Sequence, residues 1–314
     1  MTGFLGRRLL AVVPLLLIVT AIVFSLILLL PGDAAVALVG MDNASEETIA
    51  AIRTRFGLDQ PLYVQYGRWL GRALHGDLGV SIRTNEPVLG AILDRLPITL
   101  GLAIAATAVG VVIGVPLAVI AAHRGGLVDT LARGTASLGV AMPNFWLGGL
   151  LVMVVALELR WLPATGYVGF TDDPVDALRH FALPTITLGA SAIAEVTRQL
   201  RSGLLDTLAT DYIRTARAKG LGEQAVVSRH ALRNALIPLV TIAALTVNRI
   251  IGATVVVESI FALPGLGRLN LESVLNRDFP TLQGSVLVMA LIVIAINLVS
   301  DVAYGVVDPR IRYR

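Results

Sequence analysis

The sequence predicts an all-α protein, a polytopic bundle of membrane-spanning helices. Of its 314 residues, 55% are hydrophobic and only 15% are charged, and its mean hydropathy is +0.78. A water-soluble domain carries about a quarter charged residues, so this chain has too little charge to cover a surface that faces water. Its apolar residues also lie in long uninterrupted runs, which favours the bilayer over water as the solvent.

Four charge-free runs define the clearest spans, because each reaches the ~20 residues that cross a hydrocarbon core. Two further spans, at residues 181–201 and 235–257, are expected although they contain charges. Glu195, Arg198 and Arg201 lie in the second half of the first, and Arg249 lies within the second. The six predicted spans cover residues 9–30, 98–122, 135–157, 181–201, 235–257 and 279–301.

Proline and glycine positions indicate how these helices pack. Pro143 lies inside the third span, and a proline there removes a backbone donor and can bend the helix. Gly110 and Gly114 stand one turn apart in the second span, which predicts close approach of another helix. Both features indicate a bundle, and neither identifies what crosses it.

The distribution of arginine predicts the orientation. Among the short connections, positive charge concentrates on the side that also holds the N-terminus, which places both ends of the chain in the cytoplasm. Residues 31–97 then form an outer segment and residues 202–234 a cytoplasmic loop. The first apolar run is too long for a signal-peptide core of about 7–15 residues, so an uncleaved first span is favoured over a leader. We expect residues 1–314 to form a single transmembrane domain.

Several kinds of chemistry are excluded by the residues themselves. The chain has no cysteine, which rules out disulfides, thiolate metal sites and a cysteine nucleophile. Its four histidines form no HExxH pattern, and no GxSxG sequence occurs. The only lysine, Lys219, follows Ala218 and precedes Gly220, so no GxxxxGK[ST] phosphate loop exists. We therefore expect no catalytic or metal site, no bound cofactor and no nucleic-acid partner, and any energy from ATP must come from another protein.

The cytoplasmic loop contains a short predicted helix. Asp211 can cap its start and Gly220 can end it, while Tyr212, Ala216 and Lys219 recur at helical spacing and would share one face. A short helix with small side chains and basic edges can bind in a groove of another protein. An ordinary basic loop that fixes the topology explains the same residues equally well.

A family resemblance favours the first of these alternatives. The sequences TARAKGL (215–221) and RHALRNALIP (229–238) resemble the EAA loop of ABC importer permeases of the dipeptide/oligopeptide/nickel family, and the chain resembles the B-type subunit of peptide permeases. Further matching segments follow in the family's order along almost the whole chain: LPGD (30–33), GLDQPLYVQY (57–66), GDLG (76–79), PNFW (143–146), ESIFALPGLG (258–267) and DPR (308–310).

The resemblance implies an ABC type I importer fold and a division of labour in a bacterial inner membrane. Two homologous permeases form the path for di- or oligopeptides, two cytoplasmic ATPases bind ATP and Mg²⁺, and an extracytoplasmic binding protein delivers the substrate. The coupling role of the EAA loop is carried over to eight residues: Tyr212, Thr215, Ala216, Arg217, Lys219, Gly220, Leu221 and Gly222. Nickel or another small solute is an alternative cargo, and a secondary transporter or a non-transporting scaffold is an alternative function.

Two further groups of residues are candidates for contact with substrate or partners. An arginine at mid-span is costly in lipid, so Arg249, with Asn248 and Asn144, is expected to line the path and to bind a peptide carboxylate. Alternatively, Arg249 pairs with a carboxylate of the companion permease or extends to the interface. A second set is expected to form an outer gate or a binding-protein contact, or else a rigid loop that packs the end of the bundle: Glu258, Phe261, Pro264 and Gly265.

Overall fold

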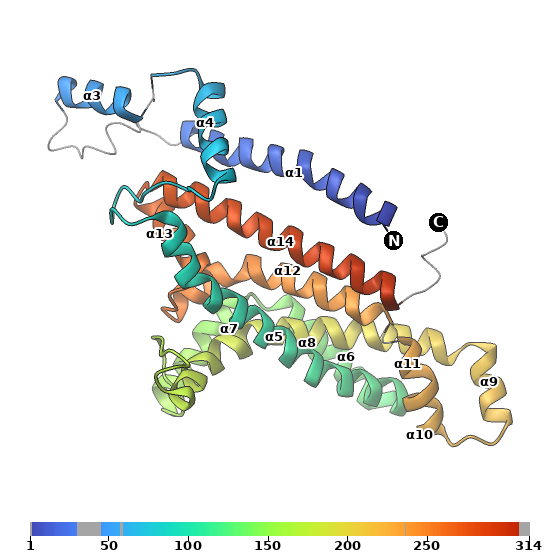
Figure 1. Cartoon of the computed structure of the whole chain (residues 1–314). Helices are drawn as coiled ribbons and strands as arrows, with labels where there is room; N and C mark the ends of the chain where they lie inside the picture. The colour runs from blue at the N-terminus through green and yellow to red at the C-terminus, as the bar shows by residue number, and fades with distance from the viewer. Residues whose placement is uncertain (1, 30–44, 57–58, 236, 308–314) are drawn as a thin grey trace. The chain divides into compact units, whose positions relative to one another are not determined.

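The computed structural model describes residues 2–29, 45–56, 59–235 and 237–307 (Figure 1). Within these ranges the chain is helical, apart from its connecting segments and one isolated antiparallel bridge between Val80 and Pro87. The predicted all-α class is therefore confirmed. The matching segments at 30–33 and 308–310, and the first two residues of the one at 57–66, lie outside the described residues.

The structure contains the following elements in chain order: α1 (Thr2–Leu29), α3 (Glu46–Phe56), α4 (Leu62–Leu74), α5 (Val88–Arg124), α6 (Gly126–Ala141), α7 (Asn144–Leu151), the π-helical η2 (Val152–Glu158), α8 (Pro174–Leu208), α9 (Asp211–Ala218), α10 (Glu223–Ala225), the π-helical η3 (Val226–Ala231), α11 (Leu232–Ala235), α12 (Ile237–Ile260), α13 (Leu266–Leu275) and α14 (Phe279–Val307).

The chain divides into two compact units. Unit 1 comprises residues 1–97 and 268–294, and unit 2 comprises residues 98–267 and 295–314. The expectation of a single transmembrane domain remains a prediction. All the residues singled out above for coupling, path and gate lie in unit 2.

Three helices in the described parts of the chain are long and apolar enough to cross a membrane. They are α5, the Ile242–Ile260 part of α12 and the Phe279–Val302 part of α14, and a bent helix pair raises the number to four. The 35-residue α8 exceeds the length of a span but carries Glu195, Arg198 and Arg201 in its second half. The total of six spans stays a prediction.

The bent pair lies where the third span is expected, at residues 135–157. Helix α6 ends at Ala141, and the segment Asn144–Glu158 runs at 98° to Gly126–Gly139. The cause lies in the local sequence: Pro143 has no amide hydrogen, and its ring disfavours a helical conformation of Met142, whose ψ is 124°. The bend predicted from Pro143 is confirmed, and the bounds of the third span remain a prediction.

Helix α8 also begins earlier and ends later than the predicted span 181–201. The Asp173 side chain caps it by accepting hydrogen bonds from the amides of Val175 and Asp176, with Pro174 at the first helical position. At ~1.5 Å per residue, its 35 residues extend about 50 Å. It forms the central helix of unit 2, in contact with α6, α7, α11 and α12.

Small residues let α5 approach α8 closely. A Cβ atom built on Gly110 would lie 2.5 Å from the Cβ of Ala192, and one on Gly114 would lie 3.0 Å from the Val196 side chain. The close contact predicted from the two glycines is confirmed, because no larger residue fits at Gly110 without displacing α8.

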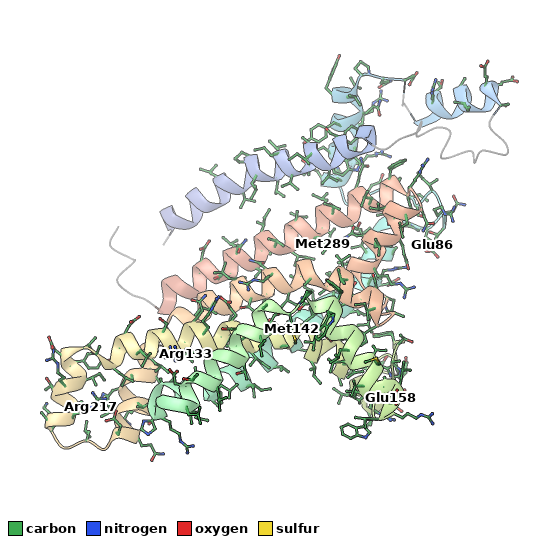
Figure 2. All side chains as sticks on the ribbon, turned by 180° about the vertical axis from the view of Figure 1, so that it is seen from behind. Glu86, Arg133, Met142, Glu158, Arg217 and Met289 are labelled. Atoms are coloured by element: carbon green, nitrogen blue, oxygen red, sulfur yellow. The ribbon has the colours of Figure 1, made fainter. Side chains whose placement is uncertain are left out.

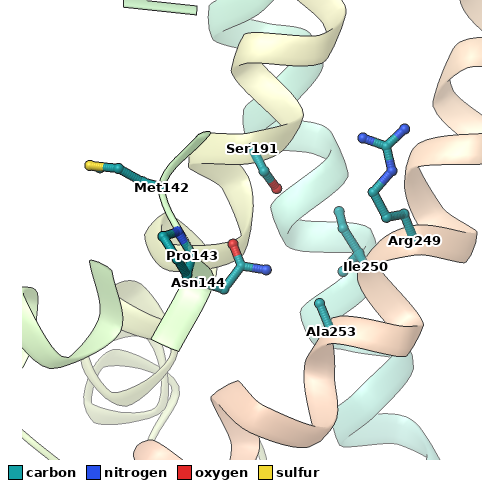
Figure 3. Close-up of a pocket in the computed structure, with 7 residues that line it drawn as sticks. All are labelled: Met142, Pro143, Asn144, Ser191, Arg249, Ile250 and Ala253. Carbon is teal, nitrogen blue, oxygen red and sulfur yellow. The ribbon is translucent and has the colours of Figure 1, made fainter. Parts of the chain in front are cut away.

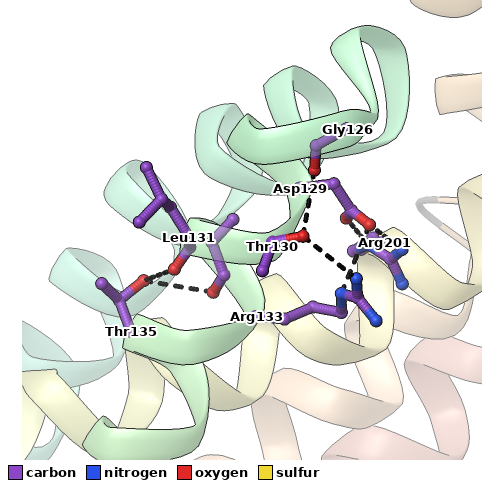
Figure 4. A network of polar contacts seen from close by, with 8 residues as sticks. Gly126, Asp129, Thr130, Leu131, Arg133, Thr135 and Arg201 are labelled. Atoms are coloured by element: carbon purple, nitrogen blue, oxygen red, sulfur yellow. Dashed lines mark hydrogen bonds and ion pairs between the residues drawn. The ribbon is translucent and has the colours of Figure 1, made fainter.

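An ion-pair network joins the first half of α6, which precedes the predicted third span, to α8. The Asp129 carboxylate, only 9% exposed, accepts two hydrogen bonds from the Arg201 guanidinium, one of them at 2.7 Å (Figure 4). Arg133, one turn along α6, lies 3.3 Å from the same carboxylate. The two-point contact from Arg201 fixes both the position and the plane of the carboxylate.

In unit 1, α1 packs on α4 through Phe24, Tyr66 and Trp69, whose ring centroids are 5.6–6.3 Å apart. The loop before α5 is held by Asp278, which accepts hydrogen bonds from the Ser81 hydroxyl at 2.6 Å and the Ile82 amide at 3.2 Å. This buried carboxylate anchors part of the predicted outer segment to the chain that leads into α14.

Candidate functional site

The helix predicted in the cytoplasmic loop is present as α9 and is fixed by its own apolar face. Ile213 is fully buried and Ala216 is 7% exposed. Ile213 belongs to a buried cluster that combines the second half of α5, the last turns of α8 and the segment that follows α9: Ala118, Leu200, Leu204, Val226, Ala231 and Ala235. The apolar face of α9 is therefore packed into the same buried cluster as residues of α8 and α5.

The other face of α9 is polar and exposed. Arg214 pairs with Asp211 one turn earlier. Tyr212 is 43% exposed, and its hydroxyl accepts a 2.6 Å hydrogen bond from the Asn234 amide group. That bond links the start of α9 to α11. Helix α9 is therefore fixed both by its buried apolar face and by a hydrogen bond on its polar face.

The turn that ends α9 is closed by a bidentate ion pair. Arg217 donates to the two carboxylate oxygens of Glu223 at 2.6 and 3.0 Å, while Gly220 between them adopts φ +81°. The Arg217 hydrogen bonds hold the pKa of Glu223 below its ordinary value of 4.5, against an opposing effect of desolvation, and the charges of Arg217 and His123 act in the same direction as the hydrogen bonds. A positive φ suits glycine, which explains why the helix ends there.

The structure separates the eight predicted coupling residues into two sets. Seven are exposed: Tyr212, Thr215, Arg217, Lys219, Gly220, Leu221 and Gly222. Ala216 instead faces the chain's own core, whereas Tyr212 and Lys219, expected on the same face, are exposed, and the coupling role of all eight residues remains a prediction. Residues 213 and 216 are three apart and mark the buried stripe of the helix, which spacing alone did not distinguish from the exposed one.

A pocket of about 190 Å³ lies where the break between α6 and α7 meets α8 and α12 (Figure 3). Figure 2 places Met142, at this break, between Arg217 at one end of unit 2 and Glu158 at the other. The pocket is lined by three polar residues and four apolar ones: Asn144, Ser191, Arg249, Met142, Pro143, Ile250 and Ala253. Asn144 and Arg249, both expected to line a path, are thus brought together.

The mid-span arginine has an ionic partner within its own chain. Arg249 Nη1 lies 3.6 Å from Glu195 Oε2. Glu195 itself is 4% exposed and accepts shorter hydrogen bonds of 2.6 Å from Arg198 and from Gln199. The charge of Arg249 in the bundle is therefore balanced by α8, whereas the sequence had suggested a carboxylate of a second permease or an interfacial position.

Asn248 does not join Asn144 and Arg249. Its side-chain amide donates a 2.6 Å hydrogen bond to Asn297 of α14 and is not part of the pocket wall. Adjacent positions on a helix point about 100° apart, so Asn248 and Arg249 serve two different neighbours. The expectation that Asn248 lines the path remains a prediction.

The segment after α12 is a tightly bonded turn. Glu258 is fully buried and accepts a 2.7 Å hydrogen bond from the Thr99 hydroxyl, which in turn accepts one of 2.8 Å from the Leu266 amide. A Cβ on Gly265 would lie 2.3 Å from the Glu258 carboxyl carbon, so the chain passes directly over this carboxylate.

Three of the four expected gate residues are buried in this turn, namely Glu258, Phe261 and Gly265, and the fourth, Pro264, is half-buried. Their exposed neighbour is Ser259. Contact with another protein at this turn would depend on Pro264 and the backbone rather than on the Glu258 or Phe261 side chains. The role of gate or docking surface remains a prediction.

Comparison with known proteins decides the family. The model of the binding-protein-dependent transport system inner membrane component matches residues 114–313, and the model of its N-terminal part matches residues 1–103. This chain belongs to that family. The permease is therefore a multi-pass inner-membrane transport component.

Relatives align with this permease over its full length. It is 44% identical over 314 residues to a protein of Brucella abortus (strain 2308) named as a peptide transport system permease, with 100% of both chains covered. It is 41% identical over 315 residues to the glutathione transport system permease GsiC of Escherichia coli O6:H1, and 37% identical over 338 residues to the dipeptide transport system permease DppB of Escherichia coli K12, again with 100% coverage of each chain.

The fold of the permease also matches solved structures. A chain of the MetNI methionine ABC transporter in an inward-facing crystal form superposes with a TM-score of 0.59 at 17% identity, over 70% of this chain and 97% of that one. The predicted importer transmembrane fold is thereby confirmed.

Sequence reasoning missed Ser191 and Met142 in the pocket and Glu195 as the ionic partner of Arg249. Ser191 and Met142 carried no signal in the sequence, since a serine in an apolar helix and a methionine before a proline are common. Glu195 did carry one: a carboxylate within a predicted span and an arginine within another indicate a possible pair between the two helices.

Proposed function

We propose that this permease is one of two membrane subunits of an ATP-driven importer of short peptides. The observation that carries the proposal is the alignment, over the full length of each chain, to three permeases named for peptide, glutathione and dipeptide transport. Glutathione is itself a small peptide, so the three names share a substrate class. The companion would be a second, homologous permease that closes the path from the other side.

The energy for transport is proposed to come from two cytoplasmic ATPases that bind ATP and Mg²⁺. In support of this, the chain lacks a phosphate loop, and the MetNI structure that it resembles belongs to an ABC transporter. In this scheme the ATPases contact the exposed face of α9 and the turn after it, through Thr215, Lys219, Leu221 and Gly222. Ile213 and Ala216 on the opposite face would pass the movement to α8 and α5.

Binding of ATP would close the ATPase pair and shift the permease from an inward-facing to an outward-facing state. Such a shift requires that the nucleotide-bound ATPases hold one state of the permease more tightly than the other. An external binding protein would deliver the peptide to the outward-facing state, and the turn at residues 258–267 is the proposed contact. Both chain termini would lie in the cytoplasm.

The test is reconstitution of the complete importer in lipid vesicles with its binding protein. We expect di- and tripeptides to stimulate ATP hydrolysis and to accumulate in the vesicles in an ATP-dependent way. A complex in which peptides neither stimulate hydrolysis nor accumulate would overturn the assignment, and stimulation by nickel alone would replace the substrate class.

The coupling role is tested separately by a bulky substitution on the exposed face of α9. Thr215→Trp should abolish peptide-stimulated hydrolysis and transport without lowering the amount of permease in the membrane, because Thr215 is exposed and only its hydroxyl contacts the preceding turn. Ser228→Trp in η3 is the matched control, since Ser228 is also exposed but lies outside α9. Equal activities of the two variants would refute the role of α9.

A further inference from the structure

Three polar side chains converge on the pocket between α7, α8 and α12. Figure 3 shows the Asn144 amide and the Ser191 hydroxyl turned toward the space above Ile250 and Ala253, with the Arg249 guanidinium rising beside it. Asn144 lies beside Pro143 on one side of the pocket, and Arg249 lies beside Ile250 and Ala253 on the other. Such a combination of apolar walls and a few convergent polar groups is typical of a small-molecule site.

These polar groups retain unused capacity for hydrogen bonds. Among the residues that the structure describes, the Asn144 side chain has no hydrogen-bond partner. Ser191 donates to the Leu188 carbonyl at 2.9 Å, which leaves its oxygen free to accept. Arg249 has five N–H donors, and its one ion pair, to Glu195, is long at 3.6 Å.

The charges around the pocket favour an anion. Glu195 contributes −1, while Arg198 and Arg249 contribute +1 each, so this group carries a net charge of +1 at neutral pH. Arg198 and Gln199 already bond Glu195 at 2.6 Å, so Glu195 keeps two strong partners when Arg249 turns away. The planar fork of an arginine matches a carboxylate, which can accept two parallel hydrogen bonds from it.

We propose that this pocket binds the C-terminal carboxylate of a peptide in transit. Arg249 would exchange its long contact with Glu195 for the peptide carboxylate, and the Asn144 amide would donate to the same group. The volume of about 190 Å³ is below the 300–1,000 Å³ of sites for whole drug-sized ligands. The pocket therefore holds only the terminal residue of the peptide, and the rest of the peptide extends beyond it. The pocket would then not discriminate between peptides of different sequence or length.

This proposal rests on the proposed peptide importer, and it assigns Glu195 a positioning role. In the absence of substrate, Glu195 balances the charge of Arg249 and keeps the guanidinium at the pocket wall. A carboxylate that is held by three donors is a stable counter-ion, whereas its 3.6 Å contact with Arg249 is weak enough to be replaced.

The absence of cysteine from this chain makes a direct test possible, because Ser191→Cys gives it a single thiol in the pocket. The complete importer with this variant is placed in lipid nanodiscs and treated with an anionic or a cationic methanethiosulfonate reagent, and the mass of this chain reports modification. Dialanine should slow the modification, and dialanine amide, which lacks the carboxylate, should not. The anionic reagent should react faster than the cationic one.

Combination with Arg249→Met should reduce the protection by dialanine on the order of tenfold or more, since a hydrogen bond to a charged group is lost, and should remove the preference for the anionic reagent. Arg198→Met is the matched control: it deletes a charge on the same carboxylate but does not line the pocket, so protection should fall less than in Arg249→Met and should still distinguish dialanine from its amide. Equal protection by dialanine and its amide, or unchanged protection after Arg249→Met, would overturn the proposal.

A second measurement keeps Ser191 intact and compares uptake of dialanine by importers with Arg249→Lys and Arg249→Met. Lysine keeps the charge without the fork, so uptake should fall in the order arginine, lysine, methionine. If the unmodified importer takes up no peptide at all, the proposed function fails. If it takes up dialanine and all three forms do so at the same rate, only the carboxylate site fails.

Discussion

Ile213→Ala should release α9 from the rest of the permease. Ile213 is fully buried in a cluster of seven residues from α5, α8, α9, η3 and α11. Shortening a buried isoleucine to alanine typically costs about 2–5 kcal/mol, through lost transfer free energy and the cavity left behind. Taking about 3 kcal/mol, and tenfold per ~1.4 kcal/mol, the population with α9 undocked should rise roughly a hundredfold.

Limited digestion with trypsin measures this population, because Arg214, Arg217 and Lys219 are cleavage sites within or directly after α9. For the purified permease in nanodiscs, cleavage at these sites should accelerate by a comparable factor when opening is fast relative to cleavage. Ile213→Val is the control: it costs about 1 kcal/mol and should give an acceleration of a few fold. Unchanged cleavage in Ile213→Ala would show that the cluster does not hold α9, and the transmission of movement from α9 to α8 would lose its basis.

Three further outcomes are expected. Gly110→Ala should destabilise the permease by about 1–3 kcal/mol in thermal unfolding, because the new Cβ overlaps Ala192, whereas Gly90→Ala in the same helix has open space and should stabilise by up to ~1 kcal/mol; equal shifts would contradict the α5–α8 contact. Thr99→Val removes the hydrogen bond to the buried Glu258 and should cost about 1.5–3 kcal/mol, while Thr107→Val, whose hydroxyl bonds only its own helix, should cost less. Because Arg217 holds the pKa of Glu223 below 4.5, the ion pair stabilises the turn after α9 above that pH and is lost as the pH falls through the lower folded pKa. Hydrogen exchange of the α9 amides should therefore be faster in Glu223→Gln than in the unmodified permease at neutral pH, and the two rates should converge in acid. A difference in exchange rate that does not depend on pH would refute the role of the ion pair.

The sequence predicted features that depend on neighbouring residues or on composition. The helix at Asp211–Ala218 followed from a cap and a glycine stop, and the bend at Pro143 followed from a missing amide hydrogen. The close contact at Gly110 followed from the spacing of two glycines. Each of these features depends on a property of the residue itself, namely the backbone conformations open to proline or glycine, or the absence of a side chain on glycine.

Which face of a helix is buried could not be predicted with the same success. Ala216 was expected to share a face of α9 with Tyr212 and Lys219 and lies in the core instead, beside Ile213 on the apolar side of the helix. Asn248 was expected to line the path with Arg249 but lies outside the pocket and bonds Asn297, because the rotation of α12 is fixed by its contacts with α7 and α8.

The sequence by itself determined that the chain is helical, that it belongs in a membrane and that it carries no GxxxxGK[ST] phosphate loop. These conclusions depend on hydrophobicity and on the presence or absence of particular residues, which no folding can alter. Only the tertiary structure decided that Arg249 meets Glu195, that Asn144 and Ser191 face the same pocket, and that Ile213 anchors α9. Those contacts join residues far apart in the chain, and their geometry depends on how the helices rotate and cross, which is set by packing among all of them at once.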